Sequence, residues 1–182
     1  MATVHDTTLV PTKLELLTAW LPRRPWYRGS GVPRLTKAGG FRLDDPAGEV
    51  GIEIMVVLDA ASPDVDAYLV PMTYRAAPTE GELIGTMEHG VLGTRFAYDG
   101  DGDPVLRAAL IALVRGDVQP QAQSRSDTVD PTVRVGLRPP VSDVTIHRVL
   151  TTSDAPPQPG EVSVPWRTAD GGEARGVVAS GR

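Results

Sequence analysis

The first regular pattern in the chain is a helical one near the N-terminus. Thr12 and Glu15 have the spacing of a capping box, and Pro22 and Pro25 follow where a helix should end. Between them, apolar residues recur every three to four positions, as a main stripe and an adjacent one: Leu14, Leu17 and Leu21; Leu16 and Trp20. This spacing predicts an amphipathic helix over residues 12–21.

From residue 50 the apolar pattern changes to a period of two, which is typical of a strand. One face of this segment is wholly apolar: Val50, Ile52, Ile54, Val56 and Leu58. A second alternating segment covers residues 67–75, and the short polar loop before it favours an antiparallel pair. Pro71 cannot donate to a ladder, so we expect this second strand to be an edge strand or to carry a bulge. The helix should pack on the face that bears Ile52, Ile54 and Val56.

A second helix is predicted over residues 104–115, after a short strand at 94–98. Asp103 suits the N-cap, Pro104 the first helical position and Gly116 the C-terminal stop. Its apolar face holds six residues: Val105, Leu106, Ala109, Leu110, Leu113 and Val114.

The pattern in the last third of the chain predicts a loop followed by short strands. Residues 117–131 are rich in Gln, Ser, Asp and Pro, which is typical of a linker or loop. Four strand candidates follow, at 132–137, 144–150, 162–166 and 174–178, and 170–172 (Asp-Gly-Gly) supplies a hairpin turn for the last two. Helices and mostly antiparallel strands together predict an α+β fold.

Composition narrows the function classes. The net charge is −5 and the pI about 5.2, which argues against nucleic acid and anionic membranes as partners. The absence of cysteine removes disulfides, thiolate nucleophiles and the usual structural zinc sites. No apolar run is long enough for a membrane helix, and residues 1–10 lack the order of a signal peptide, so we expect a cytoplasmic protein. Lys13 and Lys37 are the only lysines beside sixteen arginines, a bias that carries no functional weight.

The acidic loop of Asp99, Asp101 and Asp103 could suggest calcium. An EF-hand loop would need glycine and glutamate where Pro104 and Leu110 stand, and helix capping explains the spacing without a metal. We therefore expect no metal and no cofactor.

Other constellations also favour ordinary structural roles. His5, His89 and His147 are far apart and form no ligand-spaced pair, although His89, in the Gly-rich segment 85–93, is kept as a weak ligand-binding candidate. That segment matches no nucleotide-binding glycine pattern. No Gly-x-Ser-x-Gly nucleophile elbow occurs, so no catalytic residue is assigned.

An aromatic and basic cluster gives the remaining binding candidates. Trp26, Tyr27 and Arg28 stand close to Trp20, and aromatic faces with arginine suit sugars or anions. The alternative, which we favour, is that the tryptophans fill space between the helix and the sheet.

Several segments in order resemble the N-terminal cap of maltokinases and related sugar kinases. The order is carried by these pieces: Trp20-Leu21-Pro22, Trp26-Tyr27, Asp45-Pro46, Gly48-Glu49-Val50-Gly51, 68–75, Leu83-Ile84-Gly85-Thr86, 89–93, Tyr98-Asp99-Gly100 and Asp103-Pro104-Val105. The resemblance runs from about Lys13 to Gly116. It implies a cystatin-like arrangement, in which a helix packs on a curved antiparallel sheet that caps the kinase N-lobe.

The resemblance does not extend to the chemistry of a kinase. The family commonly has a lysine soon after the Trp-Phe/Tyr pair, where this chain has Ser30. Phosphoryl transfer needs a phosphate-binding lysine, a catalytic-loop aspartate and metal ligands, and His147-Arg148 is followed by Val149 where that aspartate would stand. Relatives labelled as α-glucan branching proteins do not imply branching activity, since a branching enzyme resembles a far larger barrel.

Two function classes follow from the sequence. The first is a non-catalytic accessory or interaction protein in maltose, trehalose or α-glucan metabolism, with a sugar kinase or glucan enzyme as partner. The alternative is a small carbohydrate- or metabolite-binding module that uses Trp26, Tyr27 and Arg28.

The predicted domain division is a cap-like domain over 1–116, a linker or loop over 117–131 and a small β extension over 132–182 packed on the same domain.

Overall fold

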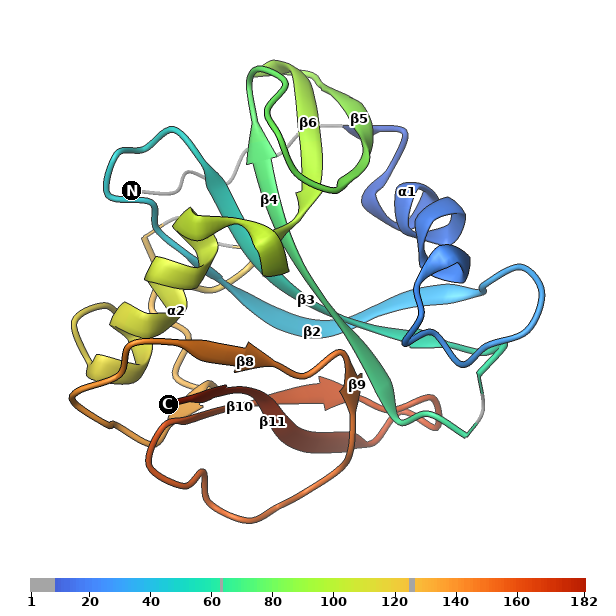
Figure 1. The fold of residues 1–182 in the computed structure, drawn as a ribbon. Coiled ribbons are helices and arrows are strands. Elements are labelled where there is room, and N and C mark those ends of the chain that lie inside the picture. The colour runs from blue at the N-terminus through green and yellow to red at the C-terminus, as the bar shows by residue number, and fades with distance from the viewer. Residues whose placement is uncertain (1–8, 63, 125–126) are drawn as a thin grey trace.

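A computed structural model describes residues 9–62, 64–124 and 127–182, and it shows mostly antiparallel sheet with two α-helices, an α+β arrangement as predicted (Figure 1). Within these residues eleven strands join one sheet, whose main path runs β1-β5-β6-β4-β3-β2-β10-β11-β8, with β7 on β10 and β9 on β4. The strands are β1 (Leu9–Val10), β2 (Leu35–Leu43), β3 (Gly51–Asp59), β4 (Ala67–Arg75), β5 (Leu83–His89), β6 (Gly93–Asp99), β7 (Arg134–Val135), β8 (Val144–Ile146), β9 (Val149–Leu150), β10 (Glu161–Arg167) and β11 (Glu173–Gly181). No helix in this described part is long and apolar enough to span a membrane.

The two helices begin and end where their local signals predict. Helix α1 (Lys13–Trp20) has the complete capping box of Thr12 and Glu15, and it continues as the 3-10 helix η1 (Leu21–Arg23). Helix α2 (Pro104–Arg115) follows the 3-10 helix η2 (Gly100–Gly102), has Asp103 as its N-cap and ends at Gly116 in the left-handed conformation. Caps depend on a few adjacent residues, which is why the sequence reveals them.

The predicted packing of the first helix is wrong. Strands β2, β3 and β4 separate two hydrophobic cores, with α1 on one side and α2 on the other (Figure 1). Leu17, Trp20 and Leu21 pack with Met55 and Val57, whereas Ile52, Ile54 and Val56 pack with α2 and the C-terminal strands. Both faces of β3 are buried, so its apolar alternation did not identify the face that α1 covers.

The expectation for Pro71 is also corrected, because β4 is an interior strand. On one side it pairs along its length with β3, including Pro71 with Ile54. On the other side it pairs with β9 at Ala67–Tyr68 and with β6 at Met72–Arg75. Pro71 lies between these two partners, where a missing donor interrupts neither ladder.

Two strands of the central sheet, β2 and β5, are not predicted by alternation. In β2 the register shifts between Lys37 and Gly39, so that Lys37 pairs with Val57 and Gly39 with Val56. Ala38 is the extra residue of this bulge. The alternation of side chains between the two faces of the sheet is therefore reversed from one side of the bulge to the other. A strand with a bulge and two glycines loses the strict period of two.

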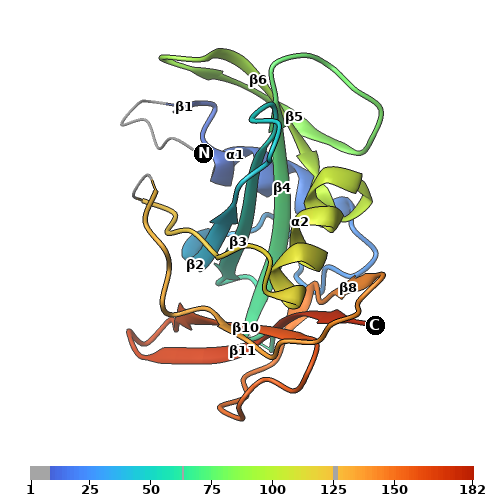
Figure 2. The same ribbon diagram turned by 90° about the vertical axis from the view of Figure 1, so that its left-hand side faces the viewer.

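The C-terminal strands lie crosswise beneath β2–β4 (Figure 2) and join the sheet through Trp166 of β10, which pairs with Gly39 of β2. The hairpin of β10 and β11 forms as predicted around residues 168–172. Buried residues of this part, among them Val164 and Trp166, belong to the same core as Ile54 and Leu110. In the loop between α2 and β7, Gln121 bridges to Arg42 and to Val129. The boundaries drawn at residues 116 and 132 stay a prediction.

Candidate functional site

The aromatic candidates lie at the edge of the core beside α1. Trp26 contacts Trp20 edge to face at 5.9 Å between centroids, and it also contacts Tyr68 at 6.0 Å. The Tyr27 ring lies 5.4 Å from Tyr68, and its hydroxyl donates to Asp59. Trp20 is buried, while Trp26 and Tyr27 are partly buried against the same core. These rings therefore contact one another and the core, as the packing interpretation expects.

The other two binding candidates are closer to solvent. Arg28 is exposed, and its backbone N–H donates to the Tyr68 hydroxyl at 3.0 Å. His89 ends β5, and its Nδ1 accepts from the backbone N–H groups of Val91 and Leu92, which form the turn into β6. Trp26, Tyr27 and Arg28 thus gather around Tyr68, whereas His89 belongs to the β5–β6 turn. A ligand-binding role for any of the four stays a prediction.

Burial and a neighbouring carboxylate both change the pKa of Tyr27. Burial, and then the hydrogen bond to Asp59, raise the pKa of Tyr27 to about 12. Burial alone would raise the pKa of Asp59, but bonds from Tyr27, Ala61 and Arg34 lower it overall. This pairing keeps the phenol protonated and the carboxylate charged near neutral pH.

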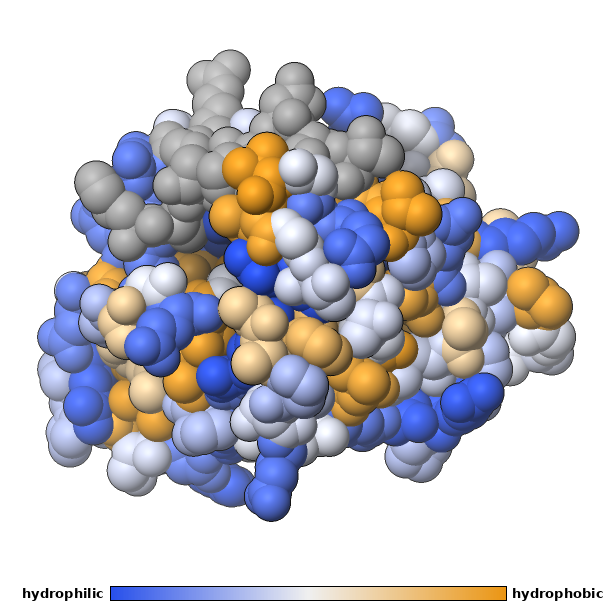
Figure 3. Space-filling view, turned by 90° about the horizontal axis from the view of Figure 1, so that it is seen from above, coloured by the Kyte–Doolittle hydropathy of each residue, from blue (hydrophilic) through white to orange (hydrophobic). Residues whose placement is uncertain are grey.

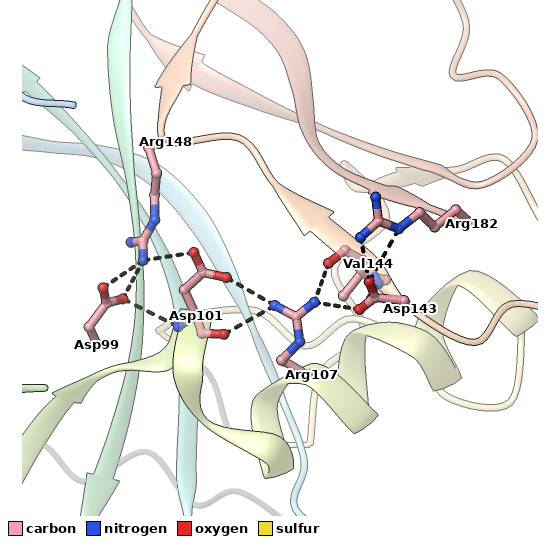
Figure 4. Close-up of polar contacts among 7 residues, drawn as sticks. All are labelled: Asp99, Asp101, Arg107, Asp143, Val144, Arg148 and Arg182. Carbon is pink, nitrogen blue, oxygen red and sulfur yellow. Dashed lines mark hydrogen bonds and ion pairs between the residues drawn. The ribbon is translucent and has the colours of Figure 1, made fainter. Parts of the chain in front are cut away.

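The acidic loop is part of a chain of ion pairs with three arginines (Figure 4). Arg148 reaches both oxygens of Asp99 at 2.6 Å and lies 3.3 Å from Asp101. Arg107, on α2, bonds Asp101 and Asp143, and Arg182 bonds Asp143. Each of the three carboxylates in this network has a guanidinium partner. The network therefore connects η2 and α2 to the C-terminal segment.

Arg148 also joins this network to the aromatic candidates. Its guanidinium lies 5.2 Å from the centroid of the Trp26 ring. The side chains of Arg148 and Asp99 are each only 9% exposed. A buried cation is thus held between an aromatic face and a carboxylate. Sequence spacing could not predict this contact, because Trp26, Asp99 and Arg148 come from three distant segments.

Asp103 does more than cap α2. Its carboxylate accepts from Val105 N–H as the N-cap, and also from the Thr73 hydroxyl and the Arg75 guanidinium, both at 2.8 Å. Burial alone would raise its pKa, but the bonds from Arg75 and Thr73 hold the pKa of Asp103 below its ordinary value. The group is a fixed, charged structural acceptor.

A groove of about 480 Å³ opens beside Asp99 and Asp103. Its lining has both signs of charge and a phenol: Arg75, Thr79, Glu80, Gly81, Glu82, Tyr98, Asp99, Gly102, Asp103 and Pro104. Glu82 accepts from the Trp20 indole at 3.1 Å and pairs with Arg24, while the Tyr98 hydroxyl accepts from Thr79 N–H. Groups that hydrogen-bond in several directions suit a polar ligand.

A second polar cluster, which the sequence did not reveal, surrounds Glu53 in β3. The Glu53 side chain is 4% exposed and lies 2.5 Å from Lys13 and 3.7 Å from Lys37. Tyr74 donates to it at 2.6 Å, and Gln123 at 3.0 Å. Burial favours the neutral acid, but the two lysines and the hydrogen bond from Tyr74 hold the pKa of Glu53 below its ordinary value. The available signal was one charged residue between Ile52 and Ile54, inside the apolar part of the strand.

Within the described residues, no three side chains of His, Cys, Asp or Glu gather in a way that could hold a metal ion. His147 shares a hydrogen bond of 2.8 Å with Ser180 across the C-terminal strands. His5 lies outside the described residues.

Comparison with known proteins supports the resemblance seen in the sequence. Residues 20–103 match the family model described as the maltokinase N-terminal cap domain. No curated protein and no solved structure matches the chain. The match covers α1's last residue through the N-cap of α2, and so includes β2–β6 of the central sheet. Residues 20–103 are therefore similar to a maltokinase N-terminal cap domain.

Proposed function

We propose that this protein is a non-catalytic accessory or interaction protein that works beside an enzyme of maltose, trehalose or α-glucan metabolism. The observation that carries the proposal is the match of residues 20–103 to a cap domain, and not to the catalytic body of a kinase. Function belongs to sites and not to folds, so the side chains in this region must also be consistent with a non-catalytic role.

The polar groups of the matched region support a structural role. Asp99 and Asp103 both accept from arginines. Each also accepts a backbone N–H at the start of a helical turn. A general base must keep a lone pair for its substrate, whereas these carboxylates are already occupied by several donors.

The β5–β6 hairpin offers a surface for the partner. Val91 and Leu92 in its turn are 62% and 42% exposed, and Val10 of the neighbouring β1 is 62% exposed. Figure 3 shows this end of the molecule, with separate apolar patches among polar ones. Apolar residues ringed by polar ones are typical of contact sites between proteins. A sugar kinase or a glucan-metabolising enzyme is the proposed partner.

Activity assays test the non-catalytic part of this proposal. The purified protein with ATP and magnesium should leave maltose, glucosamine and trehalose unphosphorylated, and it should not branch amylose. Turnover above a mock preparation that is lost in Asp101→Asn or His89→Gln would overturn the proposal.

Binding assays with purified sugar kinases and glucan enzymes test the interaction part. The double variant Val91→Asp/Leu92→Asp should abolish binding. Val32→Asp changes a residue that is 76% exposed in a different loop, and it should bind like the wild type. Equal loss in both variants would exclude the hairpin as the contact surface.

A small carbohydrate-binding module is the second candidate, and the groove beside Asp99 and Asp103 supports it. Glu80, Glu82 and Tyr98 could accept and donate hydrogen bonds to sugar hydroxyls there. Calorimetry with maltose should then give heat that Glu80→Gln reduces. An unchanged titration in that variant, or none in the wild type, would remove this candidate.

A further inference from the structure

The cluster around Glu53 contains more positive charge than its carboxylate can neutralise. Lys13 and Lys37, the only lysines of the chain, both lie against Glu53. Arg42, paired directly with Glu53 in the sheet, places a third cation beside it. The chain as a whole is acidic, with a net charge of −5, so this local excess of two positive charges is unusual.

Glu53 is already satisfied without Lys37 and Arg42. Its carboxylate accepts hydrogen bonds from Lys13, Tyr74 and Gln123. Lys37 lies at 3.7 Å, beyond hydrogen-bond distance, and its side chain is 43% exposed. Among residues 9–62, 64–124 and 127–182, the Arg42 guanidinium has no hydrogen bond or ion pair. Lys37 and Arg42 therefore both keep donors for a further partner.

The backbone of β2 brings these two cations to the same face. Lys37 pairs with Val57 and Arg42 with Glu53, and both partners point to the α1 side of β3. Without the bulge at Ala38, Lys37 would pair with Leu58 and face the opposite, apolar core. Gly40 lies between them on this face, and the Gln123 side chain, which donates to Glu53, packs against it. A bulge that turns a lysine toward an arginine is the kind of local device found at binding sites.

The electrostatics agree with this geometry. Burial lowers the pKa of Lys37, and the charges of Lys13 and Arg42 lower it further, against the opposing effect of Glu53. The charge of Arg42 also acts on Tyr74, whose pKa is raised by burial and by Glu53. Mutual repulsion between Lys37 and Arg42 is relieved when an anion lies between them.

We propose that Lys37 and Arg42 form a binding site for a phosphate group, either free phosphate or a phosphomonoester. A dianion matches the two unneutralised charges, and phosphate oxygens accept from an ammonium and a planar guanidinium at once. Lys13, Glu53 and Tyr74 form the buried support that holds the site in place. The site is independent of the proposed partner surface on the β5–β6 hairpin.

The two lysines make the test direct. Protein labelled with ¹³C only in lysine gives two ε-carbon signals, which Lys13→Arg assigns. Inorganic phosphate should shift the Lys37 signal to saturation and move the Lys13 signal less. Sodium chloride at the same ionic strength controls for screening. Glucose 6-phosphate and glucose complete the series: tighter binding of the ester identifies a phosphomonoester site, and binding no tighter than phosphate identifies a free-phosphate site.

Variants decide whether the assigned residues bind the anion. By calorimetry, Arg42→Gln and Lys37→Met should each weaken phosphate binding about tenfold, the equivalent of one lost charge-assisted bond. Lys37→Arg keeps the charge and should retain most of the affinity. Arg23→Gln, which changes an exposed arginine of η1, should bind like the wild type. A Lys37 signal that moves no more with phosphate than with chloride would overturn the proposal, as would Arg42→Gln binding like the wild type.

Discussion

The two ion-pair clusters of this protein differ in charge balance. In the network on the C-terminal side, three aspartates (Asp99, Asp101 and Asp143) meet three arginines (Arg107, Arg148 and Arg182). Around Glu53, one carboxylate meets three cations. A balanced network stabilises the contact between segments, whereas an unbalanced one leaves donors for a further anion. The comparison separates a structural role from a binding role by the balance of charge.

Removing Arg148 should have the largest effect on stability. Arg148→Leu leaves Asp99 buried without its counter-ion and removes the cation from the Trp26 ring. Losing one partner of a buried pair costs about 3–5 kcal/mol, so we expect a loss near 4 kcal/mol in urea unfolding. Arg167→Leu changes an exposed arginine at the end of β10 and should cost less than 1 kcal/mol. Equal losses in the two variants would contradict a special role for the buried pair.

Replacing Glu53 should have a smaller but still large effect. Glu53→Leu leaves Tyr74 and Gln123 without their acceptor, while Lys13 and Lys37 are partly exposed and can turn toward water. Unsatisfied buried donors cost about 1–3 kcal/mol each, so we expect a loss of about 3 kcal/mol in urea unfolding. Glu49→Leu, in the exposed loop before β3, is the matched control. A loss below 1 kcal/mol would show that the support around Glu53 is not structural.

The features that the sequence predicted are those set by neighbouring residues. Thr12 with Glu15, and Asp103 with Pro104 and Gly116, act within one helical turn, so the helix ends could be predicted. The face on which α1 packs could not, because β3 is apolar on both sides. The Glu53 cluster could not either. Lys13 and Gln123 lie 40 and 70 residues from Glu53, and the bulge that turns Lys37 depends on pairing with β3.

Asp103 permits a finer test, because capping and ion pairing can be separated. Asp103→Ala removes the N-cap of α2 and leaves the buried Thr73 hydroxyl and Arg75 without their acceptor. We expect a loss of about 2 kcal/mol in urea unfolding, above the roughly 1 kcal/mol of a cap alone. Asp103→Asn keeps a capping oxygen and should lose about half as much. Equal losses in the two variants would show that the cap contributes little beside the ion pair.

The carboxylates that accept hydrogen bonds in the folded protein should make its stability decrease in acid. Hydrogen bonds from Arg107 and Arg182 lower the pKa of Asp143 to about 2, and the pKa values of Glu53, Asp59 and Asp103 are also below their ordinary values. Folded-state pKa values below the unfolded ones give stability that is present above about pH 5 and lost as the pH falls toward 2. The urea midpoint should decrease over this range. Asp143→Asn should flatten the last part of the decrease, and Asp64→Asn, at an exposed position, should not. An unchanged acid profile in Asp143→Asn would contradict the assignment.

The smallest expected effect is that of calcium on the acidic loop. Asp99, Asp101 and Asp103 have the alternate spacing of calcium ligands, but Arg148, Arg107 and Arg75 already neutralise them. A calcium ion would have to displace guanidinium groups and release a helix cap, and it would lack the bidentate glutamate that completes an EF-hand loop. We therefore expect the same melting temperature with calcium chloride, with sodium chloride of equal ionic strength and with chelator. Ligands that bind only the folded state raise the melting temperature, so a rise of several degrees with calcium alone would reverse this view. If that rise disappeared in Asp101→Asn, the loop would be a metal site in which the arginines neutralise the carboxylates when no calcium is bound.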